Sequence, residues 1–159
     1  MSDISDSFDS FATNFDTNKP YLLHRVFVAD IQTPVSAFLK LGSGKDNCFL
    51  LESVEGGEVR GRFSVIGMSP DLIWRCRGNV AECNRDPANS GHFTAVSEAP
   101  LVSLRTLLAE SEMDNTGDLP PMSAGLFGYF GYDMIRHIED IPDQNDAVFD
   151  VYDSVLLRP

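Results

Sequence analysis

Basic residues, cysteines and long apolar runs are all scarce in this sequence of 159 residues. Only 12 Lys and Arg stand against 24 Asp and Glu, which gives a formal net charge of −12. Nucleic acids and anionic membrane surfaces bind proteins through basic patches, so this charge argues against both as partners. No apolar run approaches the ~20 residues of a membrane-spanning helix. The N-terminal residues MSDISDSFDSF carry acids where a secretory signal carries Lys or Arg, which favours a cytoplasmic location.

The cysteines Cys48, Cys76 and Cys83 lack the close paired spacing of a zinc site. An odd number of cysteines in a chain without an export signal indicates free thiols. We therefore expect all three to be reduced and buried as small apolar residues. The composition, 43% hydrophobic and 23% charged, is that of a globular protein.

The first 19 residues are predicted to be a short amphipathic segment that precedes one domain over residues 20–159. Phe8, Phe11 and Phe15 fall on one stripe of a helix, although the Ser, Asp and Asn around them favour helix poorly. We expect a short helix docked by its phenylalanines. The alternative, a membrane or partner anchor, is disfavoured because the stripe has no cationic neighbours.

Two elements are predicted before residue 45. Residues 21–29, YLLHRVFVA, are rich in β-branched and aromatic residues and predict a central strand. A helix is predicted to follow, with Thr33 as N-cap and Pro34 in its first turn, and with Gly42 just after its end. Its buried face is predicted to consist of Val35, Phe38 and Leu39.

A hairpin is predicted over residues 71–86 because Gly78-Asn79 is a two-residue turn signal. Pairing about this turn places Arg75 opposite Glu82 and Trp74 opposite Cys83. One face of the hairpin is then wholly apolar, and we expect the other face to be half-solvated. The apolar face is predicted to consist of Leu72, Trp74, Cys76, Ala81 and Cys83.

The rest of the chain predicts two helices and two strands. A helix is predicted over residues 100–112, after which residues 115–121 form a linker. Residues 124–133, AGLFGYFGYD, predict a glycine-rich strand that leads into a short helix over residues 133–139. The buried stripe of the first helix is predicted to consist of Leu101, Leu104, Leu107 and Leu108.

The chain is expected to be cut from a longer one. Residues 147–159 open a last strand, and the apolar run of residues 155–157 has nothing after it to pair with or cover it.

Residues 49–70, FLLESVEGGEVRGRFSVIGMSP, predict two strands joined by a charged, glycine-rich turn. Glu52 and Ser53 directly follow the first apolar run, and Arg60 and Arg62 return on the other side of the turn. A carboxylate holds an ammonium group and a guanidinium holds a carboxylate, so these side chains could bind a small zwitterion. The simpler alternative is a solvated hairpin tip.

Two strings, LLESVEGGEVRGRFSVIG and GLFGYFGYD, resemble the N-terminal region of anthranilate synthase component I, a chorismate-utilising enzyme family. The resemblance covers almost the whole chain after the first twenty residues. It implies an α+β fold, mainly antiparallel sheet with a few packed helices, which is the N-terminal part of the family's two-subdomain sheet sandwich. The alternatives are the similar region of aminodeoxychorismate synthase component I and a free-standing amino-acid-binding module. The Glu-Gly-Gly turn followed by Gly-Arg-Phe-Ser favours anthranilate synthase.

In this family the Leu-Leu-Glu-Ser segment lines the site at which L-tryptophan binds as feedback inhibitor. The resemblance therefore implies a regulatory site in the predicted hairpin. Its tryptophan-binding residues would be Ser53 and Glu52, together with Leu51, Arg62, Phe63 and Ser64.

The resemblance also implies an enzyme that converts chorismate to anthranilate and pyruvate, the first step of tryptophan biosynthesis, with Mg²⁺ as cofactor. Ammonia would come from a glutamine amidotransferase subunit (component II) or a fused domain. The family's catalytic and metal-binding residues lie in its C-terminal part, so none is expected among residues 1–159. We expect this chain alone to be inactive.

Overall fold

The computed structural model describes residues 11–13, 22–52, 63–113, 122–142 and 149–159. Residues 11–13 are helical, in agreement with the predicted N-terminal helix. Phe8, Phe15, the predicted linker and the tip of the central hairpin lie outside the described residues. Docking of the phenylalanine stripe and the division of the chain at residue 19 stay predictions.

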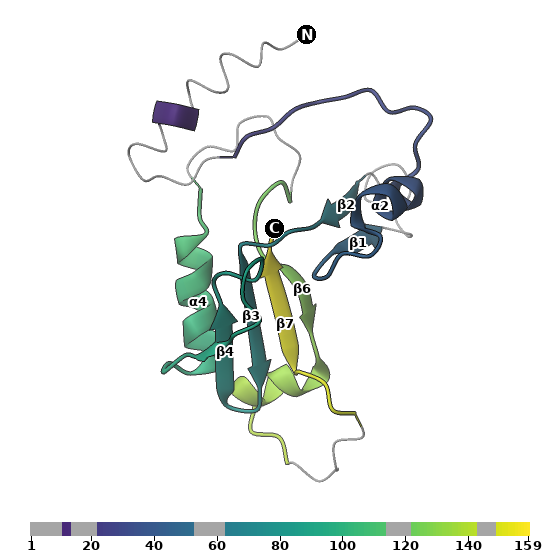
Figure 1. Ribbon diagram of the computed structural model, residues 1–159. Helices are drawn as coiled ribbons and strands as arrows, with labels where there is room; N and C mark the ends of the chain where they lie inside the picture. Colours follow the sequence, from purple (N-terminus) through teal and green to yellow (C-terminus); the bar gives the residue numbers. More distant parts are fainter. Residues whose placement is uncertain (1–10, 14–21, 53–62, 114–121, 143–148) are drawn as a thin grey trace.

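Two antiparallel sheets and a few helices form the described fold, which confirms the predicted α+β class (Figure 1). The smaller sheet pairs β1 (Phe49–Glu52) with β2 (Ser64–Gly67). The larger sheet has the strand order β5-β4-β3-β7-β6. Its strands are β3 (Leu72–Arg77), β4 (Val80–Asn84), β5 (Thr94–Ala95), β6 (Phe127–Phe130) and β7 (Ser154–Arg158). The helices are α2 (Pro34–Gly42), α4 (Pro100–Glu110) and the 3-10 helix η1 (Tyr132–His137).

The β3–β4 hairpin has the predicted register, with Arg75 opposite Glu82 and Trp74 opposite Cys83. Gly78 forms the first turn residue with a φ of +52°, a conformation that glycine adopts at little cost. The predicted apolar face is confirmed as the centre of the hydrophobic core, in which Trp74 is 1% exposed. Leu156 of the neighbouring β7 extends this face, and residues of α4 and η1 join the same core, namely Leu104, Leu107 and Met134.

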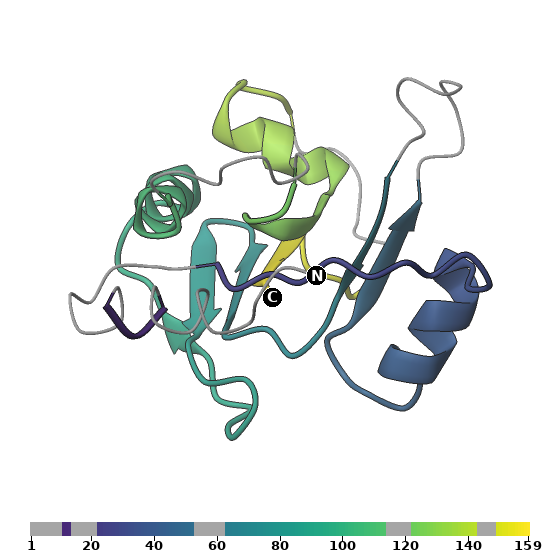
Figure 2. The same cartoon turned by 90° about the horizontal axis from the view of Figure 1, so that it is seen from above.

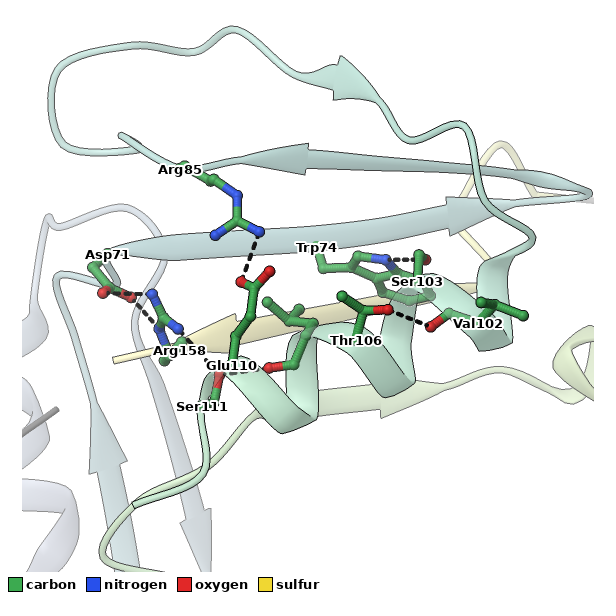
Figure 3. Close-up of polar contacts among 10 residues, drawn as sticks. Asp71, Trp74, Arg85, Val102, Ser103, Thr106, Glu110, Ser111 and Arg158 are labelled. Atoms are coloured by element: carbon green, nitrogen blue, oxygen red, sulfur yellow. Dashed lines mark hydrogen bonds and ion pairs between the residues drawn. The ribbon is translucent and has the colours of Figure 1, made fainter. Parts of the chain in front are cut away.

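Helix α4 packs against the core through a stripe that differs in part from the predicted one. Leu104 and Leu107 are buried, but Leu108 is exposed and the prediction for it was wrong. The buried Ser103 takes part in the packing face, where its hydroxyl accepts a 3.1 Å hydrogen bond from the indole nitrogen of Trp74. The helix turns this polar residue inward because the indole N–H needs a partner when it is buried. Figure 3 shows this contact on the inner side of α4.

A cluster of polar contacts fixes the C-terminal end of α4 to the sheet (Figure 3). The guanidinium of Arg158 makes two bonds of 2.7 and 2.9 Å to the carboxylate of Asp71, and it also donates to the hydroxyl of Ser111. Arg85 of the loop after β4 forms a 2.8 Å ion pair with Glu110. These contacts join the beginning of β3, the end of β7 and the end of α4.

Helix α2 begins as predicted but buries little of its apolar surface. Thr33 is its N-cap and forms a capping box with Ser36. Gly42 is the last helical residue rather than the residue after the helix. A Cβ built there would lie 3.0 Å from the Phe38 ring and 3.3 Å from the Cys48 sulfur, so a side chain has little room. The predicted buried face was wrong in part, since Val35 and Leu39 are exposed and only Phe38 is partly covered.

The predicted central strand over residues 21–29 was wrong. Residues 22–29 form no strand, and Val26 and Val28 are 82% and 88% exposed. A β-rich composition becomes a strand only where a neighbour accepts and donates the ladder hydrogen bonds. Among the described residues no strand pairs with this segment.

The glycine-rich strand and the last strand lie side by side in the larger sheet (Figure 1). A Cβ at Gly128 would lie 1.9 Å from the carbonyl oxygen of Val155, so the backbones approach too closely for any side chain. The short helix after β6 is confirmed as η1. The last strand, β7, pairs with β3 on one side and β6 on the other, and both of these partners precede it in the chain.

Candidate functional site

The β1–β2 hairpin brings Glu52 and Ser64 together. These two residues are direct cross-strand partners, as are Leu51 and Val65 one step further from the turn. Because successive side chains of a strand alternate between faces, Glu52 and Ser64 share one face of the hairpin, and Leu51 lies on the other. The site therefore offers an exposed carboxylate beside a hydroxyl at the turn end of the hairpin.

The remaining predicted tryptophan-binding residues are divided between this end of the hairpin and the undescribed turn. Ser53, Arg60 and Arg62 lie outside the described residues, so whether the guanidinium groups approach Glu52 stays a prediction. Phe63 precedes β2 and its side chain is 41% exposed.

The hairpin lies between α2 and the five-stranded sheet (Figure 2). A turn held by Cys48 connects α2 to β1, since the Cys48 thiol donates to the carbonyl oxygens of Gly42 at 3.4 Å and Lys45 at 3.2 Å. On the side of the five-stranded sheet, the ring of Phe49 stacks on the ring of Phe127 of β6, with centroids 5.3 Å apart. These contacts set the position of Glu52 and Ser64 relative to the rest of the fold.

The outer face of β3 was predicted to be half-solvated, and the structure adds aromatic cover that sequence reasoning missed. Phe93 and Tyr152 lie on the guanidinium of Arg75, 3.5 and 4.4 Å from its central carbon to the ring centroids. The predicted pair is confirmed, with 2.8 Å between Arg75 and Glu82. Arg75 is therefore engaged within the protein. Local pattern gave no signal for these rings, because both are far from Arg75 in the sequence.

All three cysteines are free thiols, as expected, although only Cys76 is fully buried. Burial, with a smaller contribution from the charge of Asp153, raises the pKa of Cys76 to about 11. Burial also raises the pKa of Cys83. The Cys76 sulfur lies 3.9 Å from the Nε2 atom of His137, but a thiol with so high a pKa is a poor nucleophile near neutral pH.

A surface cavity of about 640 Å³ lies elsewhere in the fold, along β4, β5 and the loop between them. Its lining includes Arg85, Ser90 and His92 but no residue of β1 or β2. The Arg85 side chain is already paired with Glu110. The cavity therefore does not extend the hairpin site.

No helix in the described part of the chain is long and apolar enough to cross a membrane. Within the same residues, no three His, Cys, Asp or Glu side chains gather in a way that could hold a metal ion.

Comparison with known proteins identifies relatives along almost the whole chain. Anthranilate synthase component 1 of Cereibacter sphaeroides is 46% identical over 154 residues, which are 96% of this chain and 31% of that protein. The proteins of the same name from Acetivibrio thermocellus and Synechocystis are each 36% identical, over 72% and 86% of this chain and 22% and 26% of their own lengths. No family model matches the chain.

A solved structure shows the same fold. Anthranilate synthase component I from Streptococcus pneumoniae TIGR4 superposes with a TM-score of 0.51 at 22% identity, over 87% of this chain and 28% of that one. The chain spans about a third or less of the length of these curated relatives. The resemblance first read from two short strings is thus confirmed, and the chain belongs to the anthranilate synthase component I family, to whose N-terminal region it corresponds.

Proposed function

We propose that this chain is the regulatory and scaffolding part of an anthranilate synthase component I. The identity of 46% over nearly the whole chain carries the proposal. The complete enzyme would convert chorismate and ammonia to anthranilate and pyruvate, the first step of tryptophan biosynthesis. Residues outside this chain would bind chorismate, and a component II subunit or domain would release ammonia from glutamine.

The regulatory ligand in this proposal is L-tryptophan, bound at the turn end of the β1–β2 hairpin. The carboxylate of Glu52 would hold the ammonium group, while the hydroxyls of Ser53 and Ser64 would bind the carboxylate with Arg62. Phe63, directly before β2, would pack against the indole ring. Leu51 lies on the other face of the hairpin from Glu52 and Ser64, so it would support the site from behind the strand. The cross-strand pairing of Glu52 with Ser64 supports this arrangement, because it places an anion and a hydrogen-bond donor side by side.

The described residues do not form a site that fits Mg²⁺. This ion requires several oxygen ligands in near-octahedral geometry, and no cluster of three acidic or metal-binding side chains occurs among these residues. We therefore assign no step of the reaction in this chain to the ion. In the proposal, Mg²⁺ and its ligands belong to the remainder of the complete enzyme.

Calorimetric titration of L-tryptophan into this chain and into the complete enzyme tests the regulatory site. Binding to both proteins would place a self-sufficient site in residues 1–159, whereas binding only to the complete enzyme would mean that the hairpin supplies part of a site. Absence of binding to either protein would overturn the regulatory assignment. A product assay for aminodeoxychorismate would then test the alternative family.

Two substitutions in the complete enzyme test the residues themselves. Ser53→Leu fills the predicted head-group position with an apolar side chain, and Glu52→Gln removes the charge that would hold the ammonium group. Both are expected to weaken inhibition by tryptophan and to leave anthranilate formation from ammonia largely intact. Glu112→Gln is the matched control, because Glu112 is an exposed acid after α4. Unchanged inhibition in both site variants would contradict the assignment.

The same fluorescence assay for anthranilate tests the proposed inactivity of the isolated chain. We expect no Mg²⁺-dependent turnover of chorismate by residues 1–159. Turnover by this chain would show that it contains a catalytic site of its own.

A further inference from the structure

Phe49 and Gly67 form the base of the hairpin whose turn end carries Glu52 and Ser64. The two residues are cross-strand partners, three positions along each strand from the Glu52–Ser64 pair. The ring of Phe49 lies directly over the backbone of Gly67, so that a Cβ built at Gly67 would be 2.2 Å from the nearest ring carbon. The ring can occupy this position only because residue 67 has no side chain.

The same ring is in contact with the five-stranded sheet. It stacks on the buried Phe127 of β6 with an angle of 28° between the ring planes. In the described part of the chain, no strand of one sheet is hydrogen-bonded to a strand of the other. The hairpin therefore reaches the larger sheet through side chains such as Phe49 and through the connection over residues 68–71.

Beyond Phe127, the route continues through paired strands. Phe127 is the cross-strand partner of Leu157 in β7, and the neighbouring Leu156 is the partner of Trp74 in β3. Trp74 and Leu156 belong to the buried core. A displacement of the Phe49 ring would thus act on a strand that is rigidly held to the centre of the fold.

We infer that Phe49, packed on Gly67 and stacked on Phe127, couples ligand binding at the turn end of the hairpin to the five-stranded sheet. This inference rests on the proposed regulatory site and adds the positioning residues through which that site acts. A ligand that closes on Glu52 and Ser64 changes the tilt of a short two-stranded element. The ring at its base passes this change to β6, because close-packed side chains cannot shift independently.

Gly67→Ala is the sharpest test because its effect is steric. Gly67 is not in the left-handed region, so alanine can adopt its backbone conformation, and only the added methyl group meets the ring. Gly91→Ala is the matched control, since Gly91 also lacks a positive φ and no atom lies within 4 Å of a Cβ built there. Phe49→Leu is the second variant, which removes the ring stack but retains an apolar side chain.

The measurements are tryptophan binding by calorimetry and inhibition of ammonia-dependent anthranilate formation, both on the complete enzyme. In Gly67→Ala and Phe49→Leu we expect tryptophan to bind, turnover without tryptophan to stay close to wild type, and the residual activity at saturating tryptophan to rise about five-fold or more. Gly91→Ala is expected to be inhibited like the wild type. A role limited to stability would lower the melting temperature without raising the residual activity at saturation.

The outcomes separate the inference from the function on which it rests. If the wild-type enzyme does not bind tryptophan, the proposed function fails. If the wild type binds tryptophan and is inhibited, but both variants are inhibited to the same residual activity, the coupling inference is overturned. If Gly67→Ala does not fold, as judged by circular dichroism and gel filtration, the result for Phe49→Leu decides.

Discussion

The two parts of this molecule differ in how much of their apolar sequence is buried. In the five-stranded sheet, Trp74, Leu72 and Cys76 are almost completely enclosed by α4, η1 and β7. In the N-terminal part, residues 22–31 and α2 contain a similar share of apolar residues, yet Phe27 is 67% and Ile31 92% exposed. The first part has a core of its own, whereas in the second the described residues leave many apolar side chains exposed.

This contrast fits a protein whose relatives are about three times longer. In globular domains, exposed apolar surface of this extent marks a surface for association or a liability for aggregation. The candidate hairpin lies at the boundary of the two parts, with α2 on one side and the five-stranded sheet on the other (Figure 2). A ligand bound at such a boundary can change how one part packs against the other.

The largest effect is expected from Trp74→Ala in the centre of the core. Loss of a fully buried indole should lower the free energy of unfolding by about 3–5 kcal/mol. Urea denaturation of the chain, followed by far-ultraviolet circular dichroism, measures this change. A loss below about 1 kcal/mol would show that the buried half does not supply the stability of the chain.

A smaller loss of unfolding free energy is expected from Ser103→Ala. The substitution leaves the indole N–H of Trp74 buried without its 3.1 Å partner, which should cost about 1–3 kcal/mol. Thr106→Ala is a suitable control, because the Thr106 hydroxyl donates to a carbonyl of its own helix and is exposed. Equal losses in the two variants would mean that the contact with Trp74 contributes little.

The buried thiol of Cys76 predicts a dependence of stability on alkaline pH. Its pKa is raised in the folded state from 9.0 to about 11, so the neutral thiol is favoured by folding. This contribution is fully present below pH 9 and is lost as the pH rises toward 11. Between pH 7 and pH 10, the free energy of unfolding should decline less in Cys76→Ala than in the wild type, as measured by urea denaturation. Equal declines in the two proteins would exclude the effect.

The smallest effect is expected from Val28→Ser in the exposed N-terminal segment. Val28 is 88% exposed, so its replacement should change the free energy of unfolding of this chain by less than about 0.5 kcal/mol. Urea denaturation of this variant and of Trp74→Ala under the same conditions compares the two changes directly. A loss comparable to that of Trp74→Ala would show that residues 22–29 pack against the domain in solution.

Local pattern was sufficient for elements whose partners are close in the sequence. The two-residue turn at Gly78-Asn79 fixed the register of β3 and β4, and alternation then placed Trp74 and Cys76 on the buried face. The N-cap at Thr33 was equally local. In the candidate site, the strands on either side of the charged turn were predicted in the same way, but the sharing of one face by Glu52 and Ser64 follows from the observed register.

The sequence by itself determined the α+β class, the two hairpins, the beginnings of α2 and α4, and the family. Tertiary structure decided which apolar segments became strands, because a ladder needs a partner and residues 22–29 have none among those described, whereas β7 has two. Tertiary structure also decided that the Phe49 ring packs on Gly67 and stacks on Phe127. These contacts join residues that are distant in the chain, so their geometry depends on how the elements pack and no local pattern encodes it.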